Sequence, residues 1–202
     1  MIGNLNIGGG LTVRKLPRKR APIGWRIQNS IRPAYFGGWL AVRAAVAFSW
    51  LTGIPTLTSQ LAIILRRSDG SVIDYGVVGY RSITTAFVTF VTDQLQVESS
   101  LFGDFKFHDG GVGITAENIT NTTMETTDAE ARATGTQTES AVNAYRSVGT
   151  IAYTTTKAIT EHGLFNDLTV GTLMDRTVFT AVNVVSGDSI EFSYTLTISS
   201  GG

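Results

Sequence analysis

The stretch from Ile190 to Ile198 alternates apolar and polar side chains with a period of two, and this constrains the fold more than any other feature. The side chains that face one way are all apolar, namely Ile190, Phe192, Tyr194, Leu196 and Ile198. Glutamate, serine and threonine face the other way. This pattern is typical of a half-buried antiparallel strand, with one face on a core and the other in water. We therefore expect an antiparallel sheet.

Other stretches also have the composition of strands. Leu61 to Leu65 and Val72 to Tyr80 flank Asp69-Gly70, and Asp-Gly between two such runs predicts a hairpin. Further strands are predicted at Ile83 to Val91, Leu101 to His108, Thr150 to Lys157 and Leu173 to Val185. The regular strands and turns indicate an all-β fold, an antiparallel β-sandwich or jelly-roll-like domain over residues 38–202. The expected core residues are Phe165, Phe179, Phe192 and Tyr194.

Residues 115–147 differ from this pattern, because they are rich in threonine, alanine and glutamate and poor in large apolar residues. We expect a polar loop or insertion here, which in an assembly would reach a neighbour. A short helix is a second expectation, near Ala129 to Ala133 or Glu139 to Tyr145.

The charges are separated along the chain. Residues 1–68 hold ten basic and no acidic residues, whereas all sixteen acidic residues follow from Asp69 onward, beside six basic ones. Such asymmetry suggests a basic segment that meets an acidic surface. Prolines at 17 and 22 within the densest cluster argue against a helix, so we expect residues 1–37 to form an extended basic arm.

The arm supplies the candidate partner-binding residues. Its basic members are Arg14, Lys15, Arg18, Lys19, Arg20 and Arg26, and its aromatic anchors are Trp25, Tyr35 and Phe36. Three partners suit them: the acidic remainder of a neighbouring copy, a nucleic acid through its phosphates, or another acidic protein. A solvated tail that only keeps the chain soluble is the fourth interpretation.

Overall composition favours a chain whose surface is covered by neighbours. Only 16% of residues are charged and the net charge is zero, whereas net charge is what keeps monomers apart. The alternative is a globular domain that relies on serine and threonine hydroxyls for solubility. The apolar stretch Gly38 to Leu51 contains Arg43 and is too short to span a bilayer, so we expect no membrane association.

No motif argues for catalysis, a metal or a cofactor. The chain has no cysteine, and its two histidines, His108 and His162, lack metal-ligand spacing and are expected to make single hydrogen bonds. Asp104, Asp109 and Glu117 would suit a cation in a loop. Their spacing is not that of an EF-hand. We expect neither an enzyme nor a small-molecule substrate. The start of the chain has no pattern of a signal peptide.

Three sequence segments in the C-terminal part resemble a region of structural proteins of tailed bacteriophages. They are Ile159-Thr-Glu-His-Gly-Leu-Phe-Asn, Gly171-Thr-Leu-Met-Asp-Arg-Thr-Val-Phe and Val184-Val-Ser-Gly-Asp-Ser-Ile-Glu-Phe-Ser-Tyr-Thr-Leu-Thr-Ile. The resemblance implies a virion component made in the host cytoplasm, near the capsid or the head–tail junction. It would be a multi-copy decoration protein or a connector or neck protein, in contact with its own copies and other virion proteins. The alternatives are a nucleic-acid-binding protein and a carbohydrate-binding host-attachment module.

Overall fold

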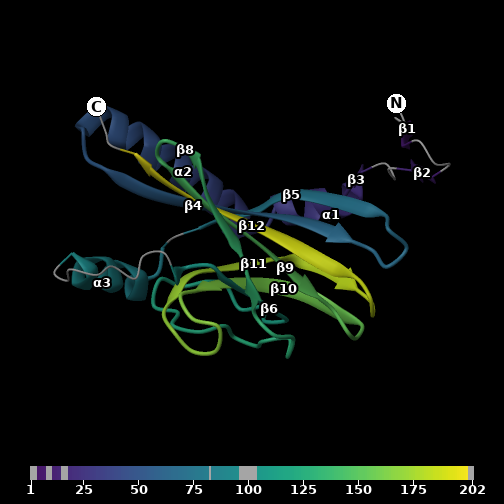
Figure 1. Cartoon of the computed structure of the whole chain (residues 1–202). Coiled ribbons are helices and arrows are strands. Elements are labelled where there is room, and N and C mark those ends of the chain that lie inside the picture. Colours follow the sequence, from purple (N-terminus) through teal and green to yellow (C-terminus); the bar gives the residue numbers. More distant parts are fainter. Residues whose placement is uncertain (1–3, 8–10, 15–17, 82, 96–103, 200–202) are drawn as a thin grey trace.

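Two sheets stack on one another in the computed structural model, which describes residues 4–7, 11–14, 18–81, 83–95 and 104–199 (Figure 1). The larger sheet has the order β3 (Arg18–Arg20), β5 (Val72–Arg81), β4 (Thr56–Arg66), β12 (Ser189–Ser199), β9 (Ala144–Ala152) and β8 (Thr136–Ala141). The smaller sheet has the order β11 (Leu173–Val184), β10 (Lys157–Phe165), β6 (Phe107–Gly111) and β7 (Ala133–Thr134). A separate hairpin joins β1 (Asn4–Ile7) and β2 (Leu11–Arg14). The mostly β architecture with two antiparallel-rich sheets agrees with the predicted sandwich.

The predicted strand from Ile190 to Ile198 is the centre of the larger sheet. It forms most of β12, which pairs antiparallel with β4 on one side and β9 on the other. Four of its five apolar residues are buried, as expected, namely Ile190, Phe192, Tyr194 and Leu196. Ile198 is 49% exposed, because its partner Leu57 on β4 is also exposed and the core ends there.

The core lies between the two sheets. All four predicted core residues are buried to within 2% exposure, Phe165, Phe179, Phe192 and Tyr194. Burying one such side chain contributes about 1.5–3 kcal/mol, so the facing strands account for much of the stability. The predicted hairpin is also present, because β4 and β5 pair on either side of Gly70, whose φ of +83° suits the turn.

The strand predicted at Ile83 to Val91 is wrong, because this segment forms helix α3 (Thr85–Gln94). The Thr84 side chain accepts a hydrogen bond from the Phe87 backbone N–H at 3.2 Å and caps the helix. Phe87, Phe90 and Val91 then pack on the core at helical spacing. Capping and this three-to-four spacing outweigh the β-branched composition.

The expectation of an extended arm up to residue 37 is wrong beyond Pro22. Helix α1 (Ile23–Ser30) follows this proline directly, and α2 (Pro33–Thr52) has Pro33 at its start. Proline suits the first helical turn, where its missing N–H would have no partner. The expected start of the β-sandwich domain at residue 38 is also wrong, since α2 continues until Gly53, which ends it at a φ of +72°. The expected boundary between residues 37 and 38 therefore falls inside α2.

Helix α2 packs closely on the larger sheet through Gly38. A Cβ atom at this position would lie 2.2 Å from the carbonyl oxygen of Tyr80 on β5, so only glycine permits this approach. Beside it, the rings of Tyr35 and Tyr80 meet edge to face at 5.5 Å. None of the helices among the described residues is both long and apolar enough to cross a membrane.

The polar loop predicted over residues 115–147 is present only in its first part. Residues 115–132 have no helix or strand, whereas residues 133–134, 136–141 and 144–152 are strands. Neither suggested short helix forms. The stretch from Glu139 to Tyr145 is the tip of the β8–β9 hairpin, and residues 139–143 are exposed there.

Candidate interaction surface

The basic residues of strand β3 lie at one edge of the larger sheet. Arg18, Lys19 and Arg20 pair in parallel with Val72, Ile73 and Asp74 of β5, and all three are exposed. The segment is therefore extended here, as predicted, and it is held by sheet hydrogen bonds. Arg18 makes a salt bridge of 3.0 Å with Asp74, but its side chain is still 55% exposed.

A groove runs between α1, the start of α2 and β5, next to this edge. Its volume is about 570 Å³, and four predicted partner-binding residues line it: Arg20, Trp25, Arg26 and Tyr35. Ile23 and Ile27 of α1 add apolar walls. Tyr75 of β5 lines the opposite side, and burial raises its pKa and that of Tyr35 above the usual value of tyrosine. Both phenols are therefore neutral at physiological pH and able to donate hydrogen bonds.

The charge of this groove is predominantly positive. The described residues 18–68 include eight basic side chains and no acidic one. Asp74 is the one acidic residue that lines the groove, and Arg18 already compensates it. Arg20 and Arg26 thus present uncompensated positive charge beside apolar walls, an arrangement that suits an acidic, partly apolar partner.

Trp25 has a structural task within the groove. Its indole N–H donates to the carbonyl oxygens of Thr180 and Ala181 on β11, at 3.2 and 2.8 Å. Its ring meets Tyr75 edge to face at 4.5 Å. The tryptophan therefore anchors α1 against the sandwich of its own chain, and its expected contact with a partner stays a prediction.

Of the other predicted residues, Phe36 is not among those that line the groove. Phe36 lies on α2, is 54% exposed and stacks with Trp39 at 6.0 Å. Arg14 ends β2, and its side chain lies outside the described part, as does the whole of Lys15. Trp39 and Trp50 are eleven residues apart on α2, about 16 Å along the helix, so these two rings do not form one platform for a sugar.

The two histidines form a buried pair that sequence reasoning missed. His108 Nδ1 lies 2.9 Å from His162 Nε2, and His108 Nε2 lies 2.9 Å from the Ser147 hydroxyl. Strands β6 and β10 are neighbours, and their register brings the imidazoles together. A sequence without strand register gives no sign of this pairing, since 54 residues separate the two histidines.

This serine–histidine arrangement is not accessible to a substrate. Ser147, His108 and His162 are each 0% exposed. Burial lowers the pKa of His108 to about 3 and that of His162 well below its usual value, so both rings are neutral. The cluster is a polar part of the core.

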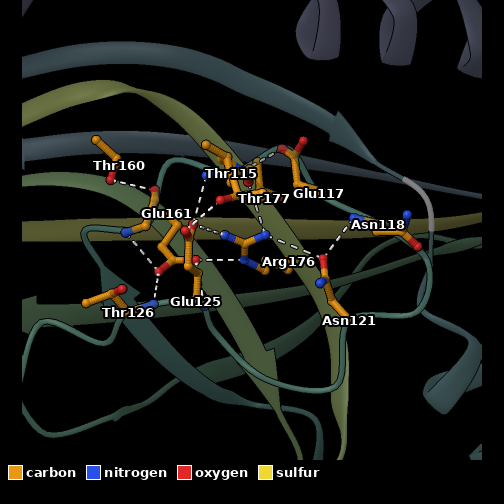
Figure 2. A network of polar contacts seen from close by, with 12 residues as sticks. Thr115, Glu117, Asn118, Asn121, Glu125, Thr126, Thr160, Glu161, Arg176 and Thr177 are labelled. Carbon is orange, nitrogen blue, oxygen red and sulfur yellow. Dashed lines mark hydrogen bonds and ion pairs between the residues drawn. The ribbon is translucent and has the colours of Figure 1, made fainter.

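A second buried network fixes the long loop to the sheet (Figure 2). Arg176 on β11 donates from Nε to Glu161 Oε2 at 2.7 Å and from Nη2 to Glu125 Oε2 at 3.1 Å. Glu161 on β10 also accepts the backbone N–H groups of Gly113 and Thr126, at 3.0 and 2.8 Å. Every acceptor of this carboxylate is used within the protein, so the network holds the loop in place.

Each of the three carboxylates considered for a cation has a different partner within the protein. Asp109 accepts from Arg132 at 3.0 Å, Glu117 accepts the Val178 N–H at 2.6 Å, and Asp104 lies 3.8 Å from Lys106. In the part of the chain that the structure describes, no three potential ligands gather at a possible metal position.

Comparison of the chain with protein-family models, with curated proteins and with solved structures finds no match.

Proposed function

We propose that the protein is a non-enzymatic structural component of a tailed-phage virion, present in several copies, as a decoration protein of the capsid or a connector or neck protein. In this proposal its basic edge and groove clasp an acidic surface of a neighbouring subunit. The observation that carries the proposal is the gathering of Arg20, Arg26 and Tyr35 in one groove, beside the exposed Arg18 and Lys19. A jelly-roll relation between the sheets and a basic arm are parts of the same proposal.

In this proposal the partner surface lies on a neighbouring copy, whose exposed acidic residues include Asp69, Asp93, Glu125, Glu139 and Asp167. All acidic residues of the chain lie from Asp69 onward, so a neighbouring copy offers the opposite charge to residues 18–68. A head-to-tail contact of this kind is heterologous and closes into a ring when the rotation permits. Ring geometry suits both a connector and a neck. Contacts between exposed charges weaken as salt screens them, and this makes the clasp testable.

The experiment measures the mass of the purified full chain by light scattering, at low salt and at about 1 M salt, where the Debye length is about 3 Å. We expect a defined oligomer at low salt that loses subunits in high salt. The double variant Arg20→Glu/Arg26→Glu should lose them already at low salt. Arg146→Glu is the matched control, because Arg146 is exposed on β9 and far from the groove in the sheet order.

Two outcomes would contradict the clasp. A wild-type chain that stays monomeric at low salt would rule out self-clasping. A double variant that assembles as well as the Arg146→Glu control would show that the groove makes no contribution.

A nucleic acid is the second candidate partner, favoured by the exposure of all three β3 side chains on the last strand of the larger sheet as described. Each neutralised phosphate contributes a slope of about −0.9 to the dependence of log K on log salt for duplex DNA. Filter retention of DNA over a salt series measures this slope. Lys19→Gln should reduce it by about one if β3 contacts phosphates, whereas an unchanged slope would exclude β3 from the contact.

A further inference from the structure

Helix α2 exposes an apolar stripe on the side opposite to the one that packs on the sheet. Phe36, Leu40, Ala44, Ala47 and Leu51 recur at three- and four-residue spacing, and all of them are exposed. The packed side carries Gly38, Val42, Ala45 and Ser49 at the complementary positions. A surface helix usually turns a polar face to water, so α2 has the composition of a helix that is covered on both sides.

The exposed fractions are large. Trp50 is 78% exposed and Leu51 81%, and Phe48 and Phe36 are exposed by half or more. Arg43 is the one charged residue of the helix, and its guanidinium lies 4.7 Å from the ring centre of its own Trp39. Nothing else on α2 carries a charge that would solvate this face.

The size of the stripe distinguishes an interface from scattered surface residues. With roughly 200 Å² for a whole aromatic side chain, Phe36 and Trp50 alone expose on the order of 250 Å². An interface of ordinary size buries about 800 Å² per partner, of which somewhat more than half is apolar. Leu40 and Leu51 on the same side are 46% and 81% exposed, so the stripe supplies much of the apolar half of such an interface.

We propose that this stripe, which we name the α2 face (Phe36, Leu40, Ala44, Ala47, Trp50 and Leu51), binds a second copy of this chain. Two properties favour a copy. The net charge of the chain is zero, so two copies do not repel one another at long range. A copy also brings an equally long apolar stripe, about 30 Å for a 20-residue helix, and both stripes are then removed from water together.

This contact rests on the proposed function and adds a second interface between copies. The two interfaces can be tested independently of one another. The clasp at the groove is electrostatic and weakens in salt, whereas the α2 contact is apolar and persists or strengthens in sulfate. The dimer should therefore remain at a salt concentration that removes the clasp.

The test is sedimentation of the full chain over a range of concentrations at about 1 M salt, with Leu51→Lys as the variant. Because Leu51 is 81% exposed, the substitution leaves the folded subunit intact, and circular dichroism checks this. We expect Leu51→Lys to raise the dissociation constant of the dimer by roughly 30-fold or more. Val142→Lys is the matched control, because Val142 at the β8–β9 tip is 97% exposed and apolar, and it should leave the constant unchanged.

A second measurement uses the absence of cysteine from the chain. A single thiol is introduced as Ala47→Cys and labelled with a polarity-sensitive dye. The fluorescence emission of this dye should shift to shorter wavelength as the protein concentration rises, whereas the emission of the same dye at Val142→Cys should not shift. A wild-type chain that is monomeric at high salt, or a Leu51→Lys variant that associates as tightly as wild type, would overturn the proposal. Capture of the monomer by phosphatidylcholine vesicles, lost in Leu51→Lys, would assign the face to lipid instead and would equally overturn it.

Discussion

Glu161 and Arg176 lie on adjacent strands with their side chains 2.7 Å apart, and neither side chain is more than 3% exposed. The pair joins the sheet to the loop that runs from β6 to β7, because Glu161 also accepts backbone N–H groups of that loop. A buried pair of this kind is costly to break, since removal of one partner leaves an uncompensated charge in the core.

Replacement of Arg176 by methionine should therefore destabilise the protein strongly. We expect a loss of about 3–5 kcal/mol in the free energy of unfolding, measured by urea denaturation. The control is Glu191→Gln, which removes the partly exposed pair of Glu191 with Arg66 at 2.7 Å and should cost about 0–1 kcal/mol. Similar losses in the two variants would show that the Glu161 network does not hold the loop.

The buried histidine pair predicts instability in acid. The pKa of each histidine is lowered in the folded state, so the unfolded chain binds more protons as the pH falls below the unfolded value of about 6.5. The associated stability is fully present above pH 6.5 and falls progressively toward pH 3. By pH 5 each histidine that stays neutral when folded costs about 2 kcal/mol.

Urea denaturation at intervals from pH 7 to pH 5 measures how the free energy of unfolding depends on pH. In the double variant His108→Gln/His162→Gln this dependence should be weaker within this range, whatever the stability of the variant at pH 7. Most carboxylates titrate below the range, so they contribute little to it. An unchanged slope in the double variant would mean that the histidines protonate without unfolding the core.

Two neighbouring glycines of α2 should respond in opposite ways to alanine. Gly38→Ala places a Cβ atom 2.2 Å from the Tyr80 carbonyl oxygen and must displace the helix from β5, at a cost of about 1–3 kcal/mol. Gly37→Ala meets nothing within 4 Å and should stabilise the helix by about 0.5–1 kcal/mol. Thermal denaturation of both variants is the measurement, and equal melting temperatures would contradict the packing of α2.

A fourth prediction concerns the burial of Phe192 in the core. Phe192 is 0% exposed and its ring lies 4.6 Å from that of His162, between the two sheets. Phe192→Ala should cost about 3–5 kcal/mol, whereas Ile198→Ala on the same strand, which is half exposed, should cost much less. Comparable losses in urea denaturation would contradict the position of the core along β12.

The features predicted from the sequence are those with a local signal. The alternation around Phe192 and the Asp69-Gly70 turn each lie within one or two strands, and both are confirmed. Helix α2 has no such signal, because both of its faces are apolar and a period of 3.6 residues is hidden. In α3, β-branched residues favoured a strand, while the cap at Thr84 decided for a helix.

The candidate surface was only partly predictable for a similar reason. The cluster of positive charge at Arg18 to Arg20 is visible in the sequence, but the groove beside it requires β5 to lie next to α1, about fifty residues away. The His108–His162 pair and the Glu161–Arg176 pair likewise depend on strand register, which a single sequence does not provide.

The central claim, that copies of this chain cover the groove and the α2 face, is tested most directly by electron cryomicroscopy of the assembly formed by the full chain at low salt. We expect a closed assembly in which Arg20 and Arg26 of one copy face acidic residues of the next, and in which Leu51 is buried between copies. Single separate subunits, or an assembly that leaves both surfaces open to solvent, would contradict it.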